Sequence, residues 1–306
     1  MTPDAIAALI AATLAAGTPL LLAGLGLLVN ERAGVLNLGA EGMMLMAAVA
    51  GFAAGFESNS VFIGFVAGAF AGAFFAAIFG ALAVGLATNQ YATGLALTLF
   101  GGGLSAFVGL PYVGQAASFD APPKLPFLSD LPWFGQALFS QHPMVYFAWA
   151  LTAVIAYVLL RTRVGLVVRA VGESPESAHA LGYPVKRIRF GAVLFGGACC
   201  GLAGAFLSLV YTPLWVEGMV AGRGWIALAL TTFATWRPAR IVLGAYLFGS
   251  VTMIQFYLQG QGVAIASQLL SMLPYLATIV VLVLISTNVS FIRLNMPASL
   301  GRPFQP

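Results

Sequence analysis

Asn37 and Glu41, an amide and a carboxyl group, stand four residues apart in a long apolar stretch. In a helix this spacing places both side chains on one face, where they can form hydrogen bonds with the same group. Counted from the charged end of the stretch at about 1.5 Å per residue, Glu41 lies about 10–13 Å inside a hydrocarbon layer about 30 Å thick. An ionisable group at that depth requires a partner or a water-filled cavity.

Two roles are open for this carboxyl group. It can line a passage for a polar solute, or it can hold the backbone amides of a neighbouring loop near the cytoplasmic face. Gly34, Gly39 and Gly42 favour the second role, because they predict a broken, re-entrant entry into the membrane.

Hydroxyl groups at Thr18, Thr93 and Thr98 are further candidates for contact with a polar solute. Pro19 removes one helical hydrogen bond, so we expect the span over residues 5–29 to be interrupted roughly midway through the bilayer. Such a break can shape a cavity, but it is also common in purely structural spans. The hydroxyls can likewise bond back to their own helices, which is their commoner use. The predicted passage comprises Thr18, Pro19, Asn37, Glu41, Thr93 and Thr98.

The polar part of the chain is the segment 161–189, which holds six of the 13 Lys and Arg residues. Within it, Ser174 is a typical helix N-cap, Pro175 fits the first helical position and Gly182 fits a left-handed stop. These signals predict a helix of about two turns, which is too short to be stable alone in water and is therefore expected to dock. The segment can be a cytoplasmic lever or an ordinary capped loop.

Enzymatic chemistry is not indicated by the sequence. The only lysines are Lys124 and Lys186, and neither follows a glycine, so the chain has no phosphate-binding loop of the Gly-Lys-Ser/Thr kind. No Ser/His/Asp arrangement and no metal-binding spacing is apparent. His142 falls in a loop, and His179 falls on the predicted short helix. We therefore expect a protein that is not an enzyme.

The composition indicates an all-α, polytopic membrane protein. Of the residues, 60% are hydrophobic and 7% are charged, and long apolar runs recur along the whole chain. We expect about nine transmembrane helices in a single domain, 1–306, with the N-terminus outside and the C-terminus inside. The proline-rich stretch 111–143 is then an external loop by the positive-inside rule. The net charge of +4 reflects the cytoplasmic loops and gives no indication of nucleic-acid binding.

Small residues at intervals of four predict two helix-packing ridges. One ridge is Gly64, Gly68, Gly72, Ala76 and Gly80, and the other is Gly197, Gly201 and Ala205. The adjacent Cys199 and Cys200 are expected to be buried packing residues, since no disulfide or metal pattern includes them.

Four stretches resemble a known family. The run from Glu31 to Met44, Glu-Arg-Ala-Gly-Val-Leu-Asn-Leu-Gly-Ala-Glu-Gly-Met-Met, strongly resembles the permeases of nucleoside-type ATP-binding-cassette (ABC) importers. The run from Asn89 to Leu97 resembles the same permeases, and Gly172-Glu-Ser-Pro resembles the coupling segment of ABC importers. The run that starts at Gly222, Gly-Arg-Gly-Trp-Ile-Ala-Leu-Ala, resembles sugar and nucleoside permeases, although Ala234 stands where they have glycine. The chain thus resembles the branched-chain amino acid/monosaccharide permease superfamily in its nucleoside-type branch.

This resemblance implies the cobalamin-permease-like fold of type II importers, with its first helix missing. It implies a working unit of two permease chains, two ATPase subunits and an external solute-binding protein, in which the second permease is a different, larger chain. ATP and Mg²⁺ would be bound by the partner ATPase, and this chain would need no cofactor. The region 172–184 would be the coupling helix. Its expected contact residues are Gly172, Glu173, Ser174, Pro175, Ala178, His179 and Gly182.

Three classes of function compete, namely an ABC-importer permease, a self-sufficient secondary transporter or channel, and an intramembrane enzyme. A secondary transporter normally couples ions through several intramembrane charges, whereas Glu41 is nearly alone. The resemblance favours the first class. The predicted passage offers hydroxyls and one amide but no basic residue, which predicts a neutral, ring-containing solute such as a nucleoside. A sugar, riboflavin or a branched-chain amino acid are the alternatives.

Overall fold

The protein is all-helical in the computed structural model, which describes residues 3–117, 119, 134–260, 266–286 and 295–305. Residues 118 and 120–133 of the predicted external loop lie outside this description. The α-helices are α1 (Pro3–Arg32), α2 (Ala40–Ser58), α3 (Val61–Gly80), α4 (Gln90–Gly109), α5 (Phe134–Leu138), α6 (Pro143–Arg161), α7 (Arg163–Glu173), α8 (Pro175–Ala180), α9 (Val185–Phe206), α10 (Arg223–Phe233), α11 (Pro238–Gly260), α12 (Ser267–Ser271) and α13 (Leu273–Ser286). One-turn π-helices follow α3 and α9, at Ala81–Gly85 and Leu207–Tyr211.

Seven of the described helices are long and apolar enough to cross a membrane, namely α1, α2, α3, α4, α6, α9 and α11. Two further apolar helices are shorter, since α10 has 11 residues and α13 has 14. A polytopic all-α membrane protein is therefore confirmed, while the expected count of nine spans is not. The cobalamin-permease-like topology stays a prediction.

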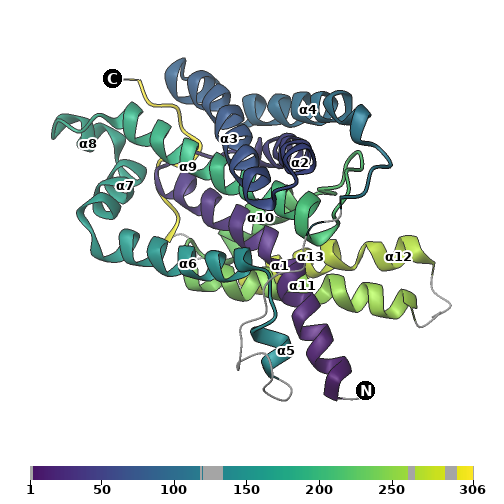
Figure 1. Ribbon diagram of the computed structural model, residues 1–306. Coiled ribbons are helices and arrows are strands. Elements are labelled where there is room, and N and C mark those ends of the chain that lie inside the picture. The colour runs from purple at the N-terminus through teal and green to yellow at the C-terminus, as the bar shows by residue number, and fades with distance from the viewer. Residues whose placement is uncertain (1–2, 118, 120–133, 261–265, 287–294, 306) are drawn as a thin grey trace.

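The first helix, α1, runs through the middle of the molecule (Figure 1). Leu21, Leu22, Leu25, Leu27 and Leu28 on it are all fully buried, which is unusual for one helix and indicates that neighbours surround it. The expected interruption at Pro19 is wrong, because α1 continues through this proline without a break. The Thr18 hydroxyl bonds back to the Leu14 carbonyl at 2.7 Å, one turn earlier on the same helix.

The two predicted small-residue ridges pack against each other, on α3 and α9. A Cβ atom on Gly72 would lie 2.2 Å from the Gly197 carbonyl oxygen, and one on Gly201 would lie 2.3 Å from the Gly68 carbonyl oxygen. No side chain fits between backbones that close, so these glycines are what lets the two helices meet. Cys199 and Cys200 are free and buried on α9, as expected.

Candidate functional site

The Glu41 carboxylate holds the first turn of α10. Its Oε1 accepts a hydrogen bond from the backbone N–H of Gly222 at 2.8 Å, and its Oε2 accepts one from Gly224 at 2.7 Å. Gly222 has a φ of +81°, which glycine adopts readily, and a Cβ on Gly224 would lie 2.6 Å from the Glu41 nitrogen. A carboxylate is favoured here because the first N–H groups of a helix have no partner within it. Of the two roles considered for Glu41, the structure shows the holding of backbone amides.

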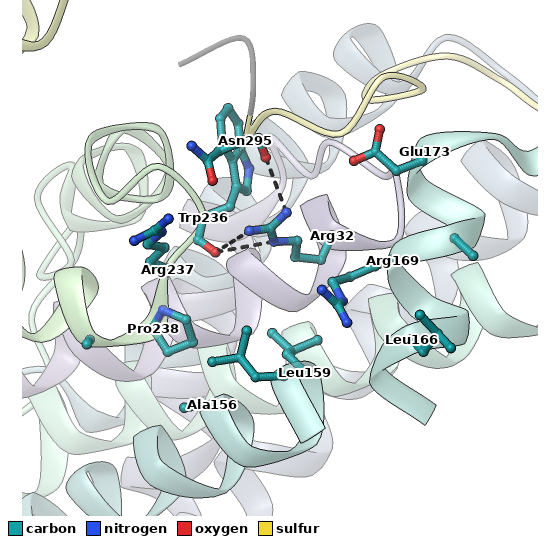
Figure 2. Close-up of a pocket in the computed structure, with 13 residues that line it drawn as sticks. Arg32, Ala156, Leu159, Leu166, Arg169, Glu173, Trp236, Arg237, Pro238 and Asn295 are labelled. Carbon is teal, nitrogen blue, oxygen red and sulfur yellow. Dashed lines mark hydrogen bonds between the residues drawn. The ribbon is translucent and has the colours of Figure 1, made fainter. Parts of the chain in front are cut away.

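A second glutamate holds the other end of α10. Glu31 is 1% exposed, and its carboxylate accepts hydrogen bonds from the Thr231 hydroxyl at 2.7 Å and from the Trp236 indole N–H at 2.5 Å. Arg32 donates to the Trp236 carbonyl oxygen at 2.8 and 3.2 Å (Figure 2). With its 11 residues, α10 is about 16 Å long, roughly half the thickness of a bilayer core. The two glutamates thus fix a half-span helix at both ends.

The segment of residues 33–39, which we call the hairpin, joins α1 to α2. It contains one predicted passage residue, Asn37, and its Leu38 is the hydrogen-bond partner of another, Thr98. The Asn37 side-chain oxygen accepts a hydrogen bond from the Gly39 N–H at 3.0 Å, which closes a local turn. The Thr98 hydroxyl of α4 donates to the Leu38 carbonyl at 2.9 Å. Together with Glu41, these groups stabilise the non-helical backbone of the hairpin, which needs such partners inside a membrane.

The remaining predicted passage residues lie elsewhere. Thr93 pairs with the Thr88 hydroxyl at 2.9 Å near the start of α4. Thr18 and Pro19 are buried on α1. The structure therefore brings Asn37, Glu41 and Thr98 together around the hairpin and leaves the other three apart. Contact of any of them with a solute stays a prediction.

A cavity of about 350 Å³ lies beside the start of α10. Its walls combine three aromatic rings with an amide, a hydroxyl and a guanidinium, and no predicted passage residue lines it. The lining residues are Ala16, Leu20, Ala221, Arg223, Ile226, Phe248, Thr252, Gln255, Phe256, Pro274 and Tyr275. No local sequence feature indicates this cavity, since residues of α1, α10, α11 and α13 form it together.

One basic residue, Arg223, lines this cavity. It is the first residue of α10. Its guanidinium donates to the carbonyls of Met219 and Val220 at 3.1 and 3.2 Å and lies 5.6 Å from the ring centre of Tyr211. The Glu41 carboxylate accepts a hydrogen bond from the N–H of Gly224, the residue after Arg223, so a negative charge lies near this arginine. The expectation that no basic residue lies along the predicted passage stays a prediction, because the cavity includes none of the predicted passage residues.

The predicted short helix is present as α8, at one end of the molecule (Figure 1). The Ser174 hydroxyl accepts from the Ser177 N–H at 3.3 Å, Pro175 is the first helical residue, and Gly182 has a φ of +86°. These local features match the sequence expectation. The role of α8 in coupling is a separate prediction.

The predicted coupling residues divide into a buried and an exposed set. Gly172, Pro175 and Ala178 are buried, Ser174 is half-buried, and Glu173, His179 and Gly182 are exposed. Two exposed apolar side chains directly after α8 were not expected, namely Leu181, which is 78% exposed, and Tyr183, which is 41% exposed. An apolar tip on a polar segment is the kind of feature that inserts into a partner's surface.

Residues 295–305, which we call the C-terminal strap, run between α8 and the hairpin. The Ser299 N–H and hydroxyl both donate to the Gly172 carbonyl, at 3.0 and 2.6 Å. The Gly301 N–H donates to the Gly34 carbonyl at 3.3 Å. Phe304 is buried with apolar side chains of α7, α8 and α9, and its ring lies 5.7 Å from that of His179.

Arg189 on α9 joins the strap to the hairpin. It is 2% exposed, and it donates to the Ala33 carbonyl at 3.1 Å, to the Arg302 carbonyl at 3.0 Å and to the Ser299 hydroxyl at 2.8 Å. Three donors in a fixed plane suit these three acceptors, which the single ammonium of a lysine would not reach together. A continuous series of contacts thus runs from α8 through the strap and Arg189 to the hairpin, and from Glu41 to α10.

These features define a class of protein: an integral membrane permease with a half-span helix at its centre and a short capped helix projecting from one end. The chain belongs to the family described as the permease component of the branched-chain amino acid transport system, whose model matches residues 9–287. It is therefore a multi-pass plasma-membrane permease subunit of an ABC transporter, and it is not itself an enzyme. The family generally works with ATPase and substrate-binding partners.

Three relatives illustrate the range within the family. A putative glucose ABC transporter permease of Haloferax volcanii is 40% identical, over 96% of both chains. A nucleoside ABC transporter permease of Lactococcus lactis is 31% identical over 87% of this chain and 88% of its own. A guanosine ABC transporter permease of Bacillus subtilis is 29% identical over 79% of both chains. No solved structure matches the chain significantly.

Proposed function

We propose that this permease conducts a neutral, polar, ring-containing solute past the start of α10, with a nucleoside as the first candidate. The observation that carries the proposal is the pair of hydrogen bonds from Gly222 and Gly224 to Glu41. This contact fixes the start of a half-span helix beside a cavity, and discontinuous helices of this kind form the solute sites of many transporters.

The charges at this cavity favour a neutral solute. Arg223 already donates hydrogen bonds to two backbone carbonyl oxygens. Its positive charge also interacts with the negative charge of Glu41, so the net charge of the two side chains is close to zero. An anionic solute would need a counter-charge that neither residue is placed to supply without losing its present partners. The rings of Phe248 and Phe256 and the amide of Gln255 instead suit a solute with one flat face and several hydroxyls.

The nucleoside is supported by the two relatives whose names specify nucleoside and guanosine transport. A monosaccharide is a second candidate, because the relative described as a putative glucose permease has the higher identity, 40%. Both solutes are neutral and rich in hydroxyls, so the charge argument applies to either.

For coupling, we propose that α8 docks on a separate ATPase subunit that binds ATP and Mg²⁺. The apolar tip of Leu181 and Tyr183 would enter the ATPase surface, with His179 beside it. The series of contacts through the strap and Arg189 would then carry a displacement of α8 to the hairpin and to α10. A second permease chain and an external solute-binding protein would complete the importer.

The test is uptake by the importer reconstituted in vesicles with its ATPase, second permease and binding protein. Labelled uridine, uridine monophosphate and glucose would be compared, with phosphatases inhibited. We expect ATP-dependent uptake of uridine and exclusion of the monophosphate. Uptake of glucose alone would assign the second candidate, and faster uptake of the intact monophosphate would contradict a neutral solute.

A further inference from the structure

A second, larger cavity of about 740 Å³ lies at the cytoplasmic end of the predicted topology, between α6, α7 and the turn that joins α10 to α11 (Figure 2). It is separate from the cavity beside α10's first residues and shares no lining residue with it. Its lining includes three arginines, Arg32, Arg169 and Arg237, and one acidic residue, Glu173. The proposed transport function gives it no role.

The positive charges of these arginines lie close enough to repel one another. The charge of Arg32 is within electrostatic range of Arg169, Arg237 and Glu173. Arg32 is half-buried and donates to carbonyl oxygens of Trp236 and Asn295, which carry only partial charges. Like charges held together in a partly dehydrated site repel, and an anion placed among them relieves that repulsion.

Arg169 is the guanidinium best placed to receive such an anion. It is half-buried, and its Nε lies 3.4 Å from the Gly165 carbonyl on its own helix, longer than the usual range of about 2.7–3.2 Å. In Figure 2 the guanidinium group of Arg169 lies on the side of Arg32 toward Leu159 and Leu166, while that of Arg32 is directed toward Trp236 and Asn295. Planar donors of this kind bind phosphate oxygens in pairs.

The walls of the cavity identify the kind of anion. Leu160 and Leu166 line it and are 63% and 60% exposed, and Ala156, Leu159 and Pro238 add further apolar surface. Leu160 belongs to the last turn of α6, which is long and apolar enough to cross a membrane, so we expect its exposed side chains to face hydrocarbon. A free phosphate or a nucleotide would leave this apolar wall uncovered, whereas a phospholipid presents its phosphate to the arginines and its acyl chains to the leucines.

We propose that this cavity binds an anionic phospholipid of the cytoplasmic leaflet, with the phosphate between Arg32 and Arg169 and the acyl chains along α6. Basic pockets between helices on the cytoplasmic side are suited to lipid head groups, because that leaflet is negatively charged. Since Arg32 also holds the Trp236 carbonyl at the end of α10, the lipid phosphate would neutralise a residue that fixes the half-span helix.

The experiment uses the assembled importer in nanodiscs of phosphatidylcholine, with and without phosphatidylglycerol, and counts retained lipid by native mass spectrometry. We expect retention of phosphatidylglycerol in preference to phosphatidylcholine. Arg169→Gln should weaken this retention about fivefold, the effect expected for one basic residue near a charged leaflet. Ala170→Trp, at an exposed lining position, should weaken it as well by filling the cavity without altering any charge.

The matched control is Arg163→Gln, which removes an exposed arginine of the same helix that does not line the cavity. It should retain phosphatidylglycerol as the unaltered protein does. A further arm adds inorganic phosphate or glycerophosphoglycerol, which carries the head group without acyl chains. Displacement of the lipid by either soluble anion would overturn the proposal in favour of a soluble ligand. Equal retention by Arg169→Gln, Ala170→Trp and the control would show that the cavity binds no lipid.

Discussion

The carboxylate of Glu41 lies 2.7 Å from the backbone nitrogen of Gly224, although 183 residues separate them in the chain. The contact joins the start of α2 to the start of α10, so two helices meet with their N-terminal ends at one carboxylate. Positive helix ends that face each other repel, and a shared negative group stabilises both. This explains how a carboxyl group remains inside an apolar molecule without an adjacent basic side chain as its direct partner.

A first prediction concerns this carboxylate. Glu41→Gln keeps the size of the side chain but turns one acceptor into an NH₂ group that faces a backbone N–H. An unpaired buried donor costs about 1–3 kcal/mol, so we expect a lower unfolding temperature and at least a tenfold loss of transport. The measurements are thermal unfolding of the importer in detergent and uptake in vesicles. Glu57→Gln, on an exposed residue of the same helix, is the control and should change both values little.

The local features of the chain were predictable because their causes are local. Ser174, Pro175 and Gly182 determine α8 through caps and φ preferences within eight residues, and the small-residue ridges follow from a spacing of four. The partner of Glu41 was not predictable, because Gly222 approaches only through the tertiary fold. Arg189 was missed for the same reason, since a basic residue in a basic segment gives no sign of burial.

At Pro19 a local sequence feature led to a wrong prediction, because the tertiary packing outweighs it. A proline inside a span removes one hydrogen bond, which led to an expected interruption of the helix. In the structure α1 is surrounded by other helices, and packing of its leucines outweighs the loss of one bond. The half-span length of α10 was also missed, because an apolar run does not reveal where a helix begins.

A second prediction concerns the tip after α8. Leu181→Asp should weaken binding of the ATPase subunit, since a charge would replace an apolar side chain that is 78% exposed. Loss of a central apolar contact in an interface commonly costs about 2 kcal/mol or more, which corresponds to roughly thirtyfold in affinity. Co-purification of the ATPase with the permease measures this. Leu110→Asp, at a residue that is 65% exposed before the external loop, should leave co-purification unchanged, and equal loss in both variants would contradict the docking role.

A third prediction concerns topology. Single cysteines at Ser177 on α8 and at Gln115 in the external loop are both exposed, so each can be labelled from its own side of the membrane. The background would lack Cys199 and Cys200, which are buried. We expect an impermeant maleimide to label Gln115→Cys in intact cells and to label Ser177→Cys only after the membrane is opened. Labelling of Ser177→Cys in intact cells would reverse the topology inferred from the basic residues.

The last prediction separates coupling from stability at Arg189. Its guanidinium holds the Ala33 carbonyl of the hairpin, the Arg302 carbonyl and the Ser299 hydroxyl of the strap, and Ser299 in turn bonds Gly172 next to α8. Arg189→Lys keeps the positive charge but cannot reach all three acceptors from one nitrogen. If movement of α8 reaches the hairpin through this residue, the variant importer should hydrolyse ATP at close to the normal rate while solute uptake falls at least fivefold. Arg187→Lys, an exposed arginine two residues earlier, is the matched control and should keep both rates. A parallel fall of ATP hydrolysis and uptake, with less permease in the membrane, would mean instead that Arg189 serves stability alone.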